Sequence, residues 1–435
     1  MDGIMFSLPV SKNYSREKFQ RDLSAGITTA ILLIPQAMAY AVLAGLPSYV
    51  GLYAAAIPLI AYAFMGTSRP LAVGPVAMDS LLTATAVGAI AAATTEAGDP
   101  NPQYLALAAL LALMVGGVQI VLGLLKLGRL VSLLTPTIIS AFTSAAALII
   151  GINQVKLILG IDLPRSAKVF NILVSTAERI GETNIPTFMI ALVSIALLIV
   201  LKRKFPQFPR AFAVVVLGAT AVIFLGLEAK GVKVIGELPT GMPAFQIPDV
   251  SIDSVLALSL DAVVIALVAF MEAISVSTRL KREDETIDAS RELVAIGSSN
   301  VLAGLFQGFP VTGGFSRSAV NDAAGAESQL ASVITALGVI LTLLFFTVAL
   351  TPIPKAVLGA IIMTAVFGLI SISDLTKIIK ENRSQLPAYL VTFWVTLLAG
   401  IQQGMVVGIV FNWILSKTLL KDNGNSKREM KEQAS

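Results

Sequence analysis

The sequence is dominated by apolar stretches of about the length that crosses a lipid bilayer as a helix. Such a helix needs about 20 predominantly apolar residues, because the hydrocarbon core is roughly 30 Å thick and a helix rises about 1.5 Å per residue. These stretches recur along nearly the whole chain, and short charged segments separate them. Of the 435 residues, 56% are hydrophobic and 13% are charged. The chain is therefore predicted to be an all-α polytopic membrane protein.

Hydrophobic patterning predicts fourteen membrane segments in two sets of seven. The first set lies at roughly 23–44, 49–65, 75–93, 103–125, 135–153, 186–201 and 211–227. The second lies at roughly 254–277, 291–308, 315–323, 329–350, 356–371, 386–401 and 403–420. Because seven is odd, two similar halves insert with opposite orientation, as in the inverted repeats of secondary transporters. The predicted repeats span 23–227 and 254–420.

Positive charge at the segment ends predicts the orientation in the membrane. Most of the 31 Lys and Arg residues fall on one side if the N-terminus is cytoplasmic, as the positive-inside rule requires. Residues 1–22 then form a retained cytoplasmic flank, and 421–435 form a polar, disordered cytoplasmic tail. The expected location is the inner (plasma) membrane. The net charge of +4 is assigned to this asymmetry and not to a nucleic-acid partner.

The chain contains neither cysteine nor histidine. This composition excludes disulfides, thiolate nucleophiles and sulfur-ligated metals, and it leaves carboxylates as the groups for a proton relay. Neither a nucleophile–base pair nor a metal-ligand cluster is readable. We therefore expect no enzymatic activity, no cofactor and no bound metal.

Two helix breaks occupy the third position of their repeats. Pro70-Leu-Ala-Val-Gly74 precedes the third segment, and Phe309-Pro-Val-Thr-Gly313-Gly314 precedes an unusually short tenth segment that begins at Phe315. Proline and glycine disfavour an uninterrupted helix, so both segments are predicted to be half-helices whose N-termini face each other. Unsatisfied N–H groups and the positive dipole ends would form an anion site there. The alternative is that both breaks are packing kinks.

Three ionisable residues within the segments are functional candidates, because a charge is costly in hydrocarbon. Arg317 begins the tenth segment and suits an oxyanion, or it forms a salt bridge that fixes the core. Glu272 in the eighth segment is the candidate coupling group, or a static partner of Arg317. Asp79 in the third segment shares a helix face with Val76 and has three open roles: neutralising Arg317, coupling, or lining the dipole end. Ser316 either donates to the anion or caps its helix.

A proline also interrupts the predicted first segment. Pro35 is expected to free a backbone carbonyl and to place Gln36 at a bend, with Tyr40 about one turn later. Gln36 would donate to the anion and Tyr40 would line its pocket. Alternatively, Gln36 satisfies the freed carbonyl.

At these residues the chain resembles the SulP sulfate-permease family, to which prestin and pendrin belong. The motifs that carry the resemblance are Leu33-Ile-Pro-Gln-Ala-Met-Ala-Tyr-Ala41, Gly45-Leu-Pro47, Gly51-Leu-Tyr53, Gly66-Thr-Ser-Arg69, Val73-Gly-Pro75, Glu272-Ala273 and Gly314-Phe-Ser-Arg-Ser318. The resemblance implies a core domain (segments one to four and eight to eleven), a gate domain (the remaining six), a homodimer and elevator-like alternating access. It implies anion contacts at Gln36, Tyr40, Val76 with the adjacent Ala77, Phe315, Ser316 and Arg317. It also links Glu272 to proton coupling.

Two features depart from that family pattern. Family members usually continue into a cytoplasmic STAS domain, whereas this sequence stops soon after the last segment, so no STAS domain is expected within it. Asp79 stands where the resemblance leads us to expect a small or apolar residue, which leaves the coupling ion open.

The predicted function is secondary active transport of small inorganic anions. Sulfate is the first candidate, carried by proton symport or by exchange. Sodium-coupled bicarbonate transport is the nearest rival, although Val276, one turn after Glu272, offers no oxygen for a cation. A dicarboxylate carrier and an anion channel are the further alternatives, and a nucleobase–cation symporter shares the seven-plus-seven plan.

Overall fold

The computed structural model describes residues 14–93, 100–128, 136–163, 169–205, 208–249, 251–368, 370–400, 403–412 and 414–415. The first half contains α1 (Arg16–Ala44), α2 (Ser48–Met65), β1 (Val73–Gly74), α3 (Ala77–Gly88), α4 (Pro102–Leu124), α5 (Pro136–Asn153), α6 (Val155–Leu159), α7 (Val169–Arg179), α8 (Ile185–Lys204) and α9 (Arg210–Leu225). The second half contains α10 (Ile252–Arg279), α11 (Ala289–Leu305), β2 (Thr312–Gly313), α12 (Phe315–Ala323), α13 (Leu330–Leu341), α14 (Thr347–Leu350), α15 (Lys355–Phe367), α16 (Ile372–Glu381) and α17 (Leu386–Ala399). A further apolar helix covers Gln403–Asn412.

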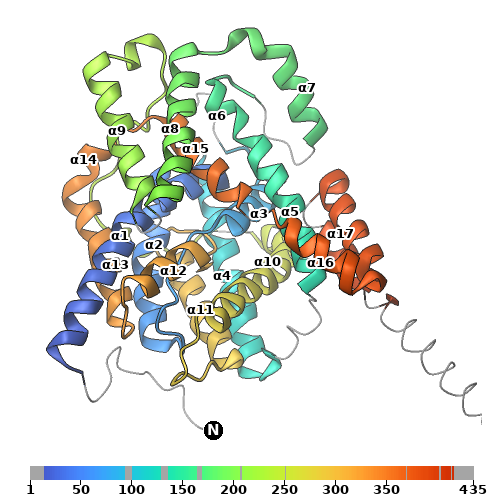
Figure 1. The fold of residues 1–435 in the computed structure, drawn as a ribbon. Coiled ribbons are helices and arrows are strands. Elements are labelled where there is room, and N and C mark those ends of the chain that lie inside the picture. Colours follow the sequence, from blue (N-terminus) through green and yellow to red (C-terminus); the bar gives the residue numbers. More distant parts are fainter. Residues whose placement is uncertain are drawn as a thin grey trace, which may run out of the picture.

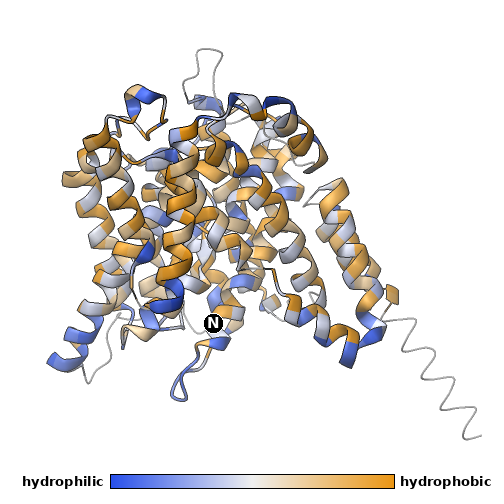
Figure 2. Cartoon of the chain, turned by 45° about the horizontal axis from the view of Figure 1, so that its top comes forward, coloured by the Kyte–Doolittle hydropathy of each residue, from blue (hydrophilic) through white to orange (hydrophobic). Residues whose placement is uncertain are grey.

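Each predicted membrane segment lies on helical structure, the last one as far as the description extends. Eight helices of the described ranges are long and apolar enough to cross a membrane, and Arg210–Leu225 and Gln403–Asn412 are shorter apolar helices. Hydrophobic residues line the helices along their lengths in Figure 2, and hydrophilic residues gather at helix ends and connections. On the outer helices large apolar side chains are bare, as for Phe224, which is 82% exposed. The chain is therefore an all-α polytopic membrane protein.

Some predicted boundaries were wrong. The third segment was expected to extend to 93, but α3 ends at Gly88 and turns follow it. Pro35 was expected to interrupt the first segment, yet it lies inside a continuous α1. The amphipathic α7 and α16 were not predicted, because their polar faces lower their average hydropathy below that of a membrane segment.

Helix packing repeats when the two halves are exchanged. In this exchange α4 corresponds to α13, α11 to α2, and α10 to α1. The contact between α4 and α11 then corresponds to that between α13 and α2, and the contact between α4 and α10 to that between α13 and α1. Among the remaining helices, α8 corresponds to α17 and α15 to α5, so the contact between α8 and α15 corresponds to that between α17 and α5. Figure 1 shows α8 and α9 (green) on one side of the molecule, and α16 and α17 (red) next to α5. This exchange symmetry supports two seven-segment repeats.

We name the two packed sets of helices for their contacts. The core group comprises α1–α4 and α10–α13, and the gate group comprises α5, α6, α8, α9, α15 and α17. Between the groups, α1 contacts α9 and α15, and α3 contacts α5. Within the core group, α4 and α11 approach closely along glycines: a Cβ added at Gly116 would lie 2.5 Å from the carbonyl oxygen of Gly297.

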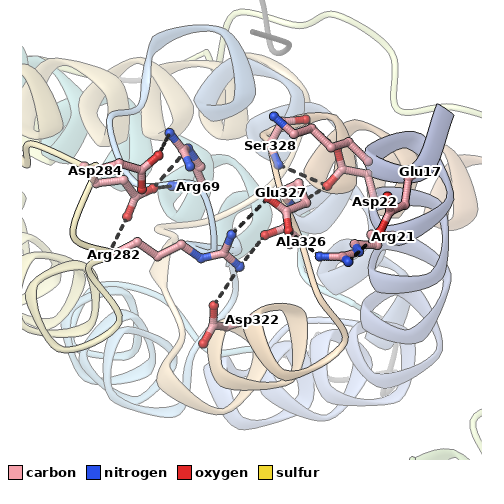
Figure 3. Close-up of polar contacts among 12 residues, drawn as sticks. Glu17, Arg21, Asp22, Arg69, Arg282, Asp284, Asp322, Ala326, Glu327 and Ser328 are labelled. Atoms are coloured by element: carbon pink, nitrogen blue, oxygen red, sulfur yellow. Dashed lines mark hydrogen bonds and ion pairs between the residues drawn. The ribbon is translucent and has the colours of Figure 1, made fainter. Parts of the chain in front are cut away.

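Polar contacts tie the core group together at the end where α1 begins (Figure 3). The carboxylate of Asp22 is fully buried and accepts hydrogen bonds from the backbone N–H groups of Glu327 and Ser328. Arg282, from the α10–α11 connection, contacts Asp322 at 3.2 Å and Glu327 at 3.4 Å. These bonds join α1 and the α10–α11 connection to the end of α12 and to the segment between α12 and α13.

Candidate anion-binding site

Two short strands bring the predicted half-helices together. β1 and β2 pair antiparallel, with Val73 opposite Gly313 and Gly74 opposite Thr312. β1 leads into α3 and β2 leads directly into α12. Because the strands are antiparallel and each precedes a helix, α3 and α12 leave the strand pair in opposite directions with adjacent N-termini. The sequence prediction of two facing half-helices is therefore confirmed.

Neither half-helix has a side-chain cap at its N-terminus. The N-cap residues are Val76 for α3 and Gly314 for α12, and neither supplies a side-chain hydrogen bond. The first N–H groups of a helix have no partner within the helix, and an uncapped end carries partial positive charge. Two such ends side by side form a concentrated set of donors suited to an anion.

Arg317 is almost completely buried, at 1% exposure, directly behind this pair of helix ends. Its guanidinium donates to the carbonyl oxygen of Pro75 at 2.5 Å and lies 3.5 Å and 3.4 Å from those of Ala72 and Thr312. The arginine thus bridges the two breaks. Among the described residues it forms no ion pair, so the salt-bridge alternative is not what the structure shows.

Glycine next to Arg317 leaves space for the guanidinium. A Cβ added at Gly314 would lie 2.8 Å from Cζ of Arg317, and one at Gly74 would lie 3.4 Å from Nη2. The Nε atom of Arg317 is buried without a hydrogen-bond partner among the described residues. The fixed charge therefore lies close to both strands and is not neutralised by direct pairing.

The other predicted anion contacts surround these helix ends. Val76 and Ala77 are buried at the start of α3, whereas Phe315 and Ser316 are exposed at the start of α12. Within the described part of the chain, the Ser316 hydroxyl is not used as a cap. The hydroxyl of Ser318, by contrast, is engaged: it donates to the Gly314 carbonyl at 2.9 Å. Ser316 therefore remains available to a ligand.

Gln36 and Tyr40 lie together on α1, which packs against both α3 and α12. Both side chains are buried, and Tyr40 is close enough to Arg317 to interact with it electrostatically. In the described ranges neither polar group is engaged in a hydrogen bond, so Gln36 does not serve as the partner of a freed carbonyl. Both groups are therefore free to contact an anion.

Glu272 and Asp79 both lie near the charge of Arg317, but their surroundings differ. Glu272, on α10, is partly exposed and interacts electrostatically with Arg317 and with Asp79. Asp79 is completely buried, and neither of its oxygens has a hydrogen-bond partner among the described residues. No ion pair joins either carboxylate to Arg317 within these residues. The predicted neutralisation of Arg317 by Asp79 is therefore not seen as a direct contact.

A buried amide network, not predicted from the sequence, lies behind the second break. Asn300 on α11 accepts a hydrogen bond from the N–H of Val311 at 2.8 Å and donates to the carbonyl of Val311 at 2.9 Å. It also donates to Gln119 on α4 at 3.0 Å, and Gln119 donates to the carbonyl of Ala266 on α10. The approach to β2 is thus fixed by three helices. The sequence signal for this network was the presence of uncharged polar residues, Asn300 and Gln119, inside apolar segments.

Two further residues were also missed. Glu292, fully buried at the start of α11, accepts from the N–H and the hydroxyl of Thr67 at 2.5 and 2.6 Å and holds the loop that leads toward β1. Arg279, at the end of α10, lies with Cζ 5.0 Å from the ring centre of Phe315. The first is a buried carboxyl group, and the second adds a cation beside an exposed site residue.

The fold and the site define a class of membrane protein in which two half-helices meet at an electropositive point between a core group and a gate group. Residues 19–392 match the model of the sulfate permease family. The chain is 38% identical to Sulfate transporter 4.1, chloroplastic, of Arabidopsis thaliana, covering 91% of this chain and 58% of that protein. It is 34% identical to a probable sulfate transporter of Mycobacterium tuberculosis, covering 92% and 70%. The chain belongs to the sulfate permease family.

Solved structures agree with this family assignment. SLC26A9 matches with a TM-score of 0.85 and 25% identity over 93% of this chain and 66% of that one. The transmembrane domain of the cyanobacterial bicarbonate transporter BicA matches with a TM-score of 0.76 and 27% identity, covering 88% of this chain and 97% of that domain. The chain spans somewhat more than half the length of the Arabidopsis relative, at 58%.

Proposed function

We propose that this chain is a secondary active transporter of small inorganic anions, with sulfate as its main substrate. The observation that carries the proposal is the pair of uncapped helix N-termini with Arg317 fixed behind them. A dianion at this point would accept hydrogen bonds from both helix starts, with Ser316, Gln36 and Tyr40 as further contacts. The sulfate transporters named among the relatives support sulfate over other oxyanions.

The proposed mechanism is elevator-like alternating access in the plasma membrane. The core group would move as one body against the gate group, carrying the anion between the two faces, with both termini cytoplasmic and two copies forming a homodimer. The dense contacts among core helices and the polar ties in Figure 3 support a rigid core.

Glu272 is the proposed coupling residue. A proton bound there would lower the charge that the core carries across the membrane field when it moves a dianion. Its position on α10, partly exposed and in electrostatic contact with Arg317, lets it respond to both proton and anion occupancy. Asp79 is the second candidate, since its buried oxygens have no partner among the described residues.

Sodium-coupled bicarbonate transport is the second candidate function, and the likeness to the BicA transmembrane domain favours it. Against it, the residue one turn after Glu272 on α10 is Val276, which is buried and apolar. Dicarboxylate transport and an anion channel are further outcomes of the test below.

The deciding experiment is uptake of labelled sulfate into proteoliposomes under an inward proton gradient, a sodium gradient, or neither. Unlabelled bicarbonate and fumarate serve as competitors. Proton-driven accumulation is expected, and the Glu272→Gln variant should keep sulfate exchange while losing its dependence on the proton gradient. Sodium-dependent bicarbonate uptake without sulfate flux would move the assignment to the rival. Conductance without uphill flux would indicate a channel.

A further inference from the structure

A cavity with a mixed polar and apolar lining lies between the core and gate groups, at the end of α1 opposite to Arg16. Its volume is about 1120 Å³. The core side is lined by the α1–α2 connection and by α3 from Leu81 to Gly88, and the gate side by α6 and the start of α15. The α3 part of the lining begins at Leu81, four residues beyond Ala77 or about 6 Å along a helix, and continues away from the helix ends to Gly88. The cavity therefore lies beyond the helix ends and does not include them.

Three lysines from three separate segments line this cavity. Lys156 belongs to α6, Lys233 to the connection between α9 and α10, and Lys355 is the first residue of α15. The backbone holds two of them side by side: the N–H of Lys355 donates to the carbonyl of Lys233 at 2.9 Å, and Val234 pairs with Pro354. Two positive side chains are thus kept adjacent by main-chain geometry.

Two carboxylates, Asp162 and Glu237, line the cavity beside the three lysines. Lys233 is paired with Asp162 through contacts of 2.6 and 2.8 Å, and that hydrogen bond lowers the pKa of Asp162, which keeps it ionised. Lys355 is partly buried, is repelled by Lys233 and attracted by Asp162, and forms no ion pair within the described ranges. An anion between the lysines would relieve that repulsion.

We propose that this lysine cavity is a second anion-binding site, which holds a divalent oxyanion such as sulfate on the access path to the helix ends. The inference rests on the proposed function for the identity of the anion. Ammonium groups act as strong point-charge donors to oxyanions, and a concave polar site between low-dielectric walls concentrates counter-ions. Occupancy of the cavity would raise the local anion concentration on this face of the carrier.

The direct test uses the 435-residue chain in detergent and an anionic amine reagent, pyridoxal 5′-phosphate. Its aldehyde carbon forms a C=N bond with a lysine amine and releases water, and borohydride then donates hydride to give a stable secondary amine that mass spectrometry locates. We expect sulfate to reduce labelling of Lys355 several-fold, while chloride at equal ionic strength protects much less. Lys230, exposed on the same connection and outside the cavity, should be labelled equally in all conditions.

A transport assay distinguishes a specific binding site from a general effect of positive surface charge. Lys355→Gln should raise the KM for sulfate supplied from the cavity side about three- to tenfold with unchanged turnover, whereas Lys230→Gln should change neither. Equal protection by chloride, or labelling of Lys355 that sulfate does not alter, would overturn the proposal. Absence of sulfate flux in the unaltered chain would instead count against the proposed function, since the labelling assay requires no transport.

Discussion

At the level of single residues, Arg317 combines a structural and an electrostatic role. Its guanidinium reaches carbonyl oxygens on both breaks, and its charge lies behind both helix ends. A planar fork of donors can bridge several acceptors, whereas an ammonium group offers a single point charge. The two roles are therefore separable by substitution.

Replacing Arg317 should separate these roles. Arg317→Ala leaves buried carbonyls without donors and is expected to cost about 3 kcal/mol of unfolding free energy and to abolish sulfate binding. Arg317→Lys keeps the charge and should retain weak binding, about tenfold below the unaltered protein, which corresponds to roughly 1.4 kcal/mol. Thermal melting and sulfate affinity measure the two effects. A lysine variant equal to the unaltered protein in both would show that the bridging geometry is dispensable.

Arg317 donates to several carbonyl oxygens, whereas the buried carboxylate of Asp79 has no donor among the described residues. Burying an ionised carboxylate is more costly than burying a neutral amide of the same shape. Asp79→Asn is therefore expected to raise the melting temperature of the substrate-free protein by a few degrees. Asp249→Asn, at an exposed position, serves as the charge-matched control. A lower melting temperature for Asp79→Asn would mean that a bound proton, cation or water already stabilises the carboxylate.

At the level of elements, the helix pair α4 and α11 sets the frame that holds β2. These helices approach closely because glycines face the opposite backbone, as at Gly116 and Gly304. The close approach brings Asn300 within hydrogen-bonding distance of Gln119 on the facing helix. Tight packing of the helix pair and positioning of the second break are therefore linked.

Adjacent glycines on α4 provide a matched pair to test this link. A Cβ at Gly116 would meet the Gly297 carbonyl oxygen at 2.5 Å, whereas a Cβ at Gly117 would meet nothing within 4 Å. Gly116→Ala should lower the unfolding free energy by about 1–3 kcal/mol through overpacking and should reduce transport. Gly117→Ala should be neutral or slightly stabilising, since alanine favours helix. Equal melting temperatures for the two variants would contradict the packing argument.

At the level of the whole molecule, the lysine cavity lies between two groups of helices that pack mostly within themselves. Thr85 on α3 and Leu157 on α6 line opposite sides of it. If the core group moves against the gate group, a covalent link across the cavity should stop transport without destroying the anion site.

The chain contains no cysteine, so such a link can be introduced cleanly. Joining Thr85→Cys to Leu157→Cys with a flexible bismaleimide should abolish sulfate uptake while leaving sulfate binding within about twofold. Thr85→Cys joined to Leu46→Cys, both on the core side, is the control and should transport normally. Full uptake by the cross-group link would exclude a rigid-body movement of the two groups.

The sequence alone determined the features that depend on local chemistry. Apolar length defined the membrane helices, and Pro and Gly at Pro70–Gly74 and Phe309–Gly314 predicted the two breaks. The start of α12 at Phe315 followed directly from the second break, and Arg317 was recognised because a charge there is unusual. These properties act over a few residues, so they are readable along the chain.

The partners of these residues follow from tertiary packing. Arg317 donates to Pro75 from the other half of the chain, Asn300 fixes Val311 across a helix gap, and Lys355 lies beside Lys233 through a backbone bond. Hydrogen bonds and charge repulsion depend on separations of a few ångströms, and sequence distance does not encode those separations. Local chemistry therefore predicted the two breaks and the unusual Arg317, and packing between the two halves determined how they are held.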